Sequence, residues 1–261
     1  MSNPRDHAQH PHRVRPGDST DSAGHTWHDR SLSPTGFERD TGQADPAMRA
    51  MLRRYADGTS DDLDLMAVVA EARFLIPIVA EPVAVEVNEA GLSMDPQVNM
   101  AAVTLRGPDG TVALPVFTGT DSLSRWRPQA RPVPVSAARA AQAAVTERCD
   151  LIVIDPSGPV QCVLRASMVW ALAQQRAWEP AHTDPVVEQA VAAATAREAD
   201  VAAYRLSEGE PSGTLRITVS VQPGLDRADV EALATRIGER LATDGKIRAR
   251  IDALSFAAAP A

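Results

Sequence analysis

The chain has 261 residues, 44% of them hydrophobic and 23% charged, which is the composition of a globular protein with a substantial core. Acidic residues outnumber basic ones by 34 to 26, and the net charge of -8 argues against a nucleic-acid-binding protein, which needs a basic surface for phosphate contacts. Two cysteines exclude a disulfide framework and a four-cysteine zinc site, and no apolar run approaches the ~18 residues that cross a bilayer.

Residues 1–44 are rich in His, Pro, Gly, Ser, Thr and Asp and show no hydrophobic periodicity, which predicts a disordered tail. The N-terminus lacks the apolar segment of a secretory signal, so we expect a cytoplasmic protein. Five of the six histidines lie in this tail: His7, His10, His12, His25 and His28. A metal-binding tract and a solvated tail are the two interpretations, and the solvated tail is favoured because no carboxylate or thiol completes a fixed metal geometry.

The elements expected between residues 45 and 180 alternate between helix and strand. Helices are expected at 45–57, from Thr59 or Ser60 onward, at 120–126, at 136–148 and up to Trp178, and strands at 74–80, 98–105, 111–118, 151–154 and 160–164. Gly107–Gly110 predicts a hairpin between two of these strands. Pro77 and Pro115 each lack a ladder N–H, so both are expected at strand starts, bulges or sheet edges.

A different pattern begins after residue 181. Asp184-Pro185 predicts a helix start, and residues 214–221 and 247–251 alternate between apolar and polar side chains, which predicts strands with one buried face. With a strand near 200–207 and an amphipathic helix through 230–241, this predicts a small α-β-β-α-β domain. We therefore expect an α/β fold of the α+β type with mixed sheets, divided into a domain at 45–180 and a smaller one at 181–261.

The sequence contains none of the motifs GxGxxG, GxxxxGK[ST], HExxH or GxSxG, so it predicts no catalytic, cofactor or metal site. Asp155 and Ser157 follow a strand and form a candidate pocket, because catalytic groups collect at such ends in parallel sheets. Asp-Pro-Ser-Gly is also ordinary turn chemistry, which favours a structural turn. Cys149 and Cys162 both adjoin or lie in predicted buried strands and are expected to be inert thiols.

Two groups of side chains are candidates for a partner surface. Phe117 and Trp126 are large aromatic residues near a predicted short helix, and tryptophan is enriched in binding hot spots, although core packing explains both residues as well. Arg216, Arg248 and Arg250 would share one face of the C-terminal sheet if their strands are neighbours, and could bind an acidic segment or a phosphorylated ligand. A solvated sheet face is the structural alternative for the arginines.

The stretch Met100–Trp126 resembles the SseB family, named for enhanced serine sensitivity. The matching positions are Asp109-Gly110, Ala113-Leu114-Pro115, Phe117-Thr118, Leu123 and Trp126, followed downstream by Arg131–Pro134 and Asp155–Pro159 and preceded by Arg73–Pro77. The resemblance covers about 60–178, and residues 80–99 depart from it. It implies no catalytic residue and no cofactor.

These observations lead to two hypotheses. The first is a non-catalytic cytoplasmic protein that acts through contacts with a protein partner or a small ligand, without nucleic acid or membrane, and with room for a homo-oligomer. The second is an enzyme or an amino-acid-responsive module linked to serine metabolism, which the phenotype in the family name and the pair Asp155 and Ser157 suggest.

Overall fold

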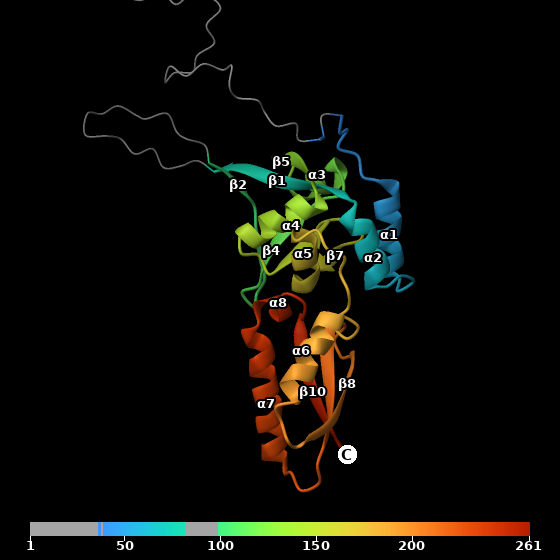
Figure 1. Ribbon diagram of the computed structural model, residues 1–261. Helices are drawn as coiled ribbons and strands as arrows, with labels where there is room; N and C mark the ends of the chain where they lie inside the picture. The colour runs from blue at the N-terminus through green and yellow to red at the C-terminus, as the bar shows by residue number, and fades with distance from the viewer. Residues whose placement is uncertain (1–35, 38, 82–98) are drawn as a thin grey trace, which may run out of the picture. The chain divides into compact units, whose positions relative to one another are not determined.

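The computed structural model describes residues 36–37, 39–81 and 99–261, and Arg39–Ala261 forms one compact unit (Figure 1). Its elements in chain order are α1 (Pro46–Ala56), α2 (Asp62–Ala70), β1 (Arg73–Glu81), β2 (Asn99–Ala102), β3 (Leu105–Arg106), β4 (Val112–Val116), α3 (Thr120–Trp126), β5 (Arg131–Ser136), α4 (Ala137–Thr146), β6 (Leu151–Ile154), β7 (Cys162–Leu164), α5 (Ala166–Ala173), α6 (Pro185–Thr195), β8 (Val201–Glu208), β9 (Thr214–Val221), α7 (Arg227–Thr243), α8 (Gly245–Arg248) and β10 (Ala253–Pro260). The prediction of an α+β fold with mixed sheets is confirmed.

Helix starts follow the capping residues in the sequence. Asp45 accepts a hydrogen bond from the Ala47 N–H at α1, and Asp184 accepts one from the Val186 N–H at α6. The second helix begins later than expected, at Asp62, because Asp61 rather than Thr59 or Ser60 is its N-cap.

Part of the predicted N-terminal tail is packed against the folded unit. The Arg73 Nε lies 2.7 Å from the Asp40 Oδ2, and the Arg73 Nη2 donates to the Gln43 carbonyl oxygen at 2.7 Å. Ordered contacts therefore begin before residue 45, while most of the predicted tail and its five histidines lie outside the described residues.

The strand β5, which was not predicted from the sequence, completes the sheet β2-β1-β5. Its prolines, Pro132 and Pro134, pair with Pro77 and Leu75 of β1. The Leu75 N–H donates to the Phe117 carbonyl on the opposite side of β1, so Pro134 and Pro132 occupy positions where no N–H is needed toward β1. Pro77 lies inside β1, the middle strand of this sheet, and not at a strand start, bulge or sheet edge as expected. The pairing of β1 with β2 begins only at Ile78, so the missing N–H of Pro77 breaks no hydrogen bond between these strands.

The second sheet has the order β3-β4-β6-β7 and contains the hairpin predicted around Gly107–Gly110. Of the strand expected at 98–105, only Leu105–Arg106 belongs to this hairpin, because Asn99–Ala102 pairs with β1 in the first sheet. β3 and β4 are antiparallel around Gly107–Gly110, as are β6 and β7, whereas β4 and β6 are parallel. The parallel pairing places the ends of β4 and β6 side by side, and there the buried Asp155 carboxylate accepts hydrogen bonds from the Thr118 N–H and hydroxyl, at 2.9 and 2.6 Å. Asp155 therefore ties two strand ends together.

The third sheet, β10-β9-β8, differs from the expectation in its last strand. The predicted strand at 247–251 is wrong: Asp244 accepts a hydrogen bond from the Lys246 N–H and starts the short helix α8, which buries Ile247. The strand follows as β10, parallel to β9. Helices α6 and α7 pack on the face of this sheet that carries Leu215, Ile217 and Val219.

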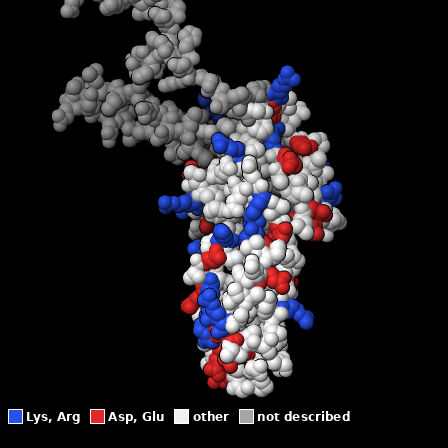
Figure 2. Space-filling model, viewed as in Figure 1, with Lys and Arg blue, Asp and Glu red and all other residues white. Residues whose placement is uncertain are grey.

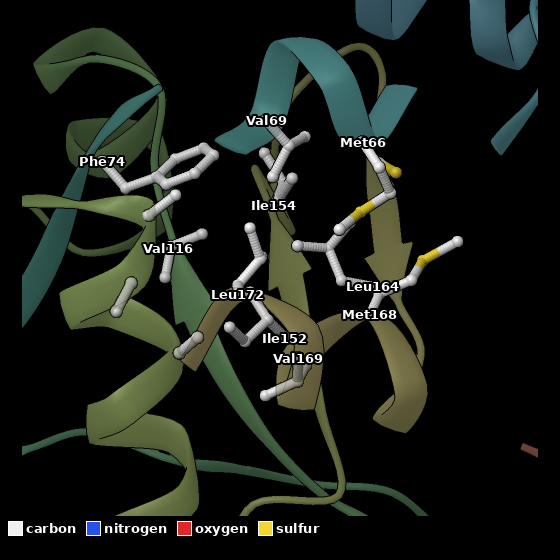
Figure 3. Close-up of a cluster of buried hydrophobic side chains, with 14 of the residues drawn as sticks. Met66, Val69, Phe74, Val116, Ile152, Ile154, Leu164, Met168, Val169 and Leu172 are labelled. Carbon is white, nitrogen blue, oxygen red and sulfur yellow. The ribbon is translucent and has the colours of Figure 1, made fainter. Parts of the chain in front are cut away.

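Buried side chains of the first half form one large cluster, which joins the helices α1, α2, α4 and α5 to the strands β1, β4, β6 and β7. Figure 3 shows part of this cluster. A second cluster comprises α6, α7 and the third sheet. The first cluster ends at Trp178 and the second begins at Val187. The predicted domain boundary near residue 181 lies between them and remains a prediction. In the described part of the chain, no helix is both long and apolar enough to cross a membrane.

A buried carboxylate in the segment between α6 and β8 gives a testable pH dependence. The Glu198 side chain is 6% exposed, and its hydrogen bonds with Arg236, together with the charge of Arg240, hold its pKa below the ordinary value. Its contribution to stability is therefore full above the unfolded-state pKa of about 4.3 and is lost as pH falls through the lower folded-state value. We expect Glu198→Gln to unfold at lower urea concentration than the wild type at pH 7, with the difference shrinking toward pH 2; Glu231→Gln, in an exposed pair, is the control. A difference that is constant with pH would contradict this assignment.

Candidate functional site

A cleft of about 440 Å³ lies where α2, the start of α5, the β8–β9 turn and the residues before β10 meet. We call it the Arg165 cleft and define it by Tyr55, Asp62, Arg165, Trp178, Thr214 and Asp252. Its volume is within the range of small-molecule sites, and its lining combines charged, aromatic and small polar side chains.

Arg165 is the centre of the cleft's charge network. Its Nη2 donates to the Asp62 Oδ2 at 2.6 Å and its Nε donates to the Asp252 Oδ2 at 3.0 Å. Burial alone would lower the pKa of the guanidinium, but the two carboxylates outweigh it and raise that pKa. The guanidinium carbon also lies 5.8 Å from the centre of the Trp178 ring. Arg165 is therefore held charged and in one place.

Asp252 supplies the missing cap of α5. Arg165 stands at the N-cap position but makes no side-chain cap. Instead the Asp252 carboxylate accepts from the Ser167 N–H at 2.7 Å and the Ser167 hydroxyl at 2.8 Å, and the Trp178 Nε1 donates to that hydroxyl oxygen at 2.9 Å. A residue 85 positions away thus satisfies one of the free N–H groups in the first turn of this helix.

Gly213, in the β8–β9 turn, lets this turn approach Arg165 closely. Its φ is +87°, and a Cβ atom there would lie 2.4 Å from the Arg165 Nε. Both the conformation and the space therefore require glycine.

Tyr55, which lines the cleft, and the two cysteines, which do not line it, are held protonated. Burial and the hydrogen bond to the Asp62 Oδ1, 2.7 Å long, raise the pKa of Tyr55 to about 12. Burial raises the pKa of the Cys162 thiol to about 12, and burial also raises that of Cys149. Because the thiolate is the reactive form, neither cysteine is activated at neutral pH.

Two polar side chains of the lining, Thr214 and His182, make no side-chain hydrogen bond with any described residue. Thr214 is 5% exposed, and its Oγ1 is buried without a hydrogen-bond partner in the described part of the chain. His182 lines the same cleft, and its imidazole makes no hydrogen bond or ion pair with any described residue. Buried polar groups are nearly always hydrogen-bonded. The unpaired Thr214 Oγ1 is therefore the group in this cleft at which we expect a ligand to form a hydrogen bond.

The predicted pair Asp155 and Ser157 is not assembled into one pocket. Asp155 lines a separate pocket of about 210 Å³, with its carboxylate already engaged by Thr118. Ser157 is exposed and outside the lining of that pocket. The alternative interpretation of this segment, a structural turn, agrees with the φ of +49° at Asp155.

The predicted aromatic surface is partly wrong. Phe117 is fully buried, with its ring centre 5.3 Å from that of Trp126, so it packs in the core and cannot touch a partner directly. Trp126 is half-buried, and the Arg127 guanidinium lies 5.0 Å from its ring centre. Phe117 follows the end of β4, where its backbone pairs with Leu75 of β1, and this pairing carries the ring inward.

The three predicted arginines do not share a sheet face. Arg216 is exposed on β9, but Arg248 belongs to α8, and Arg250 forms an ion pair with the buried Asp184. The prediction is wrong because residues 247–251 form a helix and a turn, not a strand. On the visible face of the molecule, basic and acidic side chains are interspersed (Figure 2).

Sequence reasoning missed Asp62, Arg165 and Asp252 because 103 and 87 residues separate Arg165 from its two partners. One signal was available: the apolar helix after Arg165 lacks a Ser, Thr, Asp or Asn at its N-cap, so its cap had to come from elsewhere in the chain. Among the described residues, no group of three or more His, Cys, Asp or Glu side chains could hold a metal ion.

Comparison with known proteins gives one match. Residues 48–171 match the family model described as the SseB protein N-terminal domain. No curated protein and no solved structure matches the chain.

Proposed function

The chain belongs to the SseB family, whose N-terminal domain it carries. On this premise we propose that it is a non-catalytic cytoplasmic protein that acts through contacts with a partner. The partner that the structure favours most is a small polar ligand in the Arg165 cleft. The observation that carries the proposal is that the cleft contains both paired charged groups and unpaired polar groups. Its guanidinium groups and the Asp62 and Asp252 carboxylates are paired, whereas the Thr214 hydroxyl and the His182 imidazole are not.

The surroundings of Tyr55 and Cys162 argue against either residue as a catalytic group. A general acid or base needs a pKa near the working pH and a nucleophile needs its deprotonated form. Tyr55 and Cys162, each with a pKa raised to about 12, offer neither at pH 7. Both cysteines are also free thiols, which is the ordinary state in the reducing cytoplasm.

The second candidate function is an amino-acid-responsive module. It is favoured by the mixed charge of the cleft, since carboxylates such as Asp61 and Glu208 and guanidinium groups such as Arg250 line the same space. A zwitterion carries both complementary charges. Serine and related amino acids are therefore included among the ligands to be tested.

A thermal-shift screen with amino acids and other small polar metabolites tests the proposal. We expect at least one compound to raise the Tm of the full chain, because a ligand at 100 times its Kd stabilises by about 2.7 kcal/mol. His182→Ala and Thr214→Val should abolish this shift while leaving the ligand-free protein folded, since neither side chain has a partner to lose.

Thr218→Val is the matched control, because Thr218 lies on the same strand and does not line the cleft. It should retain the full shift. The proposal fails if no compound stabilises the wild type, or if the shift persists in both cleft variants.

A further inference from the structure

A second pocket, of about 210 Å³, lies between α1 and α3 and shares no lining residue with the Arg165 cleft. Helix α1 contributes Arg49 and Arg53, which are one turn apart, and α3 contributes Asp121 and Arg125, also one turn apart. The periodicity of each helix thus directs two charged residues toward the same pocket. We call it the α1–α3 pocket and define it by these four residues and Ser122.

The three arginines of this pocket differ in how many hydrogen bonds and ion pairs they make. The Arg49 Nη2 lies 2.5 Å from both Asp121 oxygens, and this hydrogen bond holds the pKa of Asp121 below its ordinary value. Arg125 has only one contact with that carboxylate, at 3.3 Å. Arg53 makes no ion pair or side-chain hydrogen bond with any described residue. Two guanidinium groups therefore retain most of their donors.

Ser122 adds a third free donor. The residue is 2% exposed and lines the pocket, yet its hydroxyl has no hydrogen-bond partner in the described part of the chain. The lining as a whole contains three arginines and two aspartates, and the Asp155 carboxylate is engaged by Thr118. The pocket is thus locally cationic in a chain of net charge -8.

From this arrangement we propose that the α1–α3 pocket binds a phosphate group, as inorganic phosphate or as a small phosphate ester. Guanidinium groups form charge-assisted hydrogen bonds with phosphate oxygens, and donors arriving from two helices suit a tetrahedral anion better than a planar carboxylate. Arg53, Arg125 and Ser122 would donate to the anion. Arg49 remains with Asp121, and that pair holds α1 and α3 at the spacing of the pocket.

The test is calorimetric titration of the full chain at low salt with inorganic phosphate, glycerol 3-phosphate and acetate. We expect phosphate or its ester to bind, and Arg53→Gln and Arg125→Gln each to weaken that binding about tenfold or more, because each removes charge-assisted hydrogen bonds worth about 1.4 kcal/mol or more. Ser122→Ala should weaken it less. Tighter binding of the ester than of phosphate would identify the ester as the ligand.

Arg205→Gln is the matched control, since Arg205 is an exposed arginine on β8 without a partner among the described residues. It should bind phosphate as the wild type does. Absence of binding by either phosphate compound, equal weakening in the control, or acetate binding as tight as phosphate would each overturn the assignment. The Arg165 cleft is unaffected by any of these results.

Discussion

Replacing Arg165 with alanine is expected to lower the free energy of unfolding by about 3 kcal/mol. The substitution leaves Asp62 and Asp252, which are 17% and 13% exposed, without their shared cation. Two partly buried carboxylates would then face each other across the vacated space, so both the lost attraction and the new repulsion destabilise the fold. Urea unfolding at pH 7 measures the change.

Arg227→Ala is the control for this substitution, because Arg227 pairs with Glu231 on the surface of α7, at 93% and 64% exposure. Exposed pairs contribute little, so this variant should unfold near the wild-type midpoint. An Arg165→Ala protein as stable as the Arg227→Ala protein would show that the network makes no net contribution.

Asp252→Ala is expected to cost about 2 kcal/mol, the second-largest effect. It removes the acceptor of the Ser167 N–H and hydroxyl, leaving the first turn of α5 uncapped, and it takes away one of the two carboxylates on Arg165. Hydrogen exchange should locate the effect: the Ser167 amide should exchange faster, because its hydrogen bond is lost.

Asp252→Asn separates the two contributions. The amide oxygen still accepts from the Ser167 N–H, but the negative charge beside Arg165 is gone. We expect a loss of stability between those of the wild type and Asp252→Ala, with slow exchange at Ser167 retained. Unchanged exchange at Ser167 in the alanine variant would show that α5 does not depend on this distant cap.

Local signals in the sequence were sufficient for most helices and for the alternating strands. Asp45 and Asp184 stand directly before prolines, and both mark helix starts in the structure. The strand β5 was missed because Pro132 and Pro134 weigh against a strand, and only the pairing with β1 shows that neither proline needs an N–H there. The strand predicted at 247–251 failed because Asp244 caps a helix, and this outweighs the alternation.

The candidate site was much less predictable than the fold. Asp62, Arg165 and Asp252 lie on three segments that meet only after the chain has folded, and no spacing in the sequence relates them. The arginines of the α1–α3 pocket have the same origin, since Arg53 and Arg125 come from different helices. The local sequence around Asp155 did identify a turn, but it could not show that Thr118 occupies the carboxylate.

Proton NMR of the metabolite mixture incubated with the full chain distinguishes a ligand that only binds in the Arg165 cleft from one that is transformed there. We expect saturation transfer from the protein to at least one compound, its loss in His182→Ala, and an unchanged composition of the mixture after prolonged incubation. If the wild type consumes a compound and His182→Ala does not, the cleft is an active site and the proposed non-catalytic function is wrong.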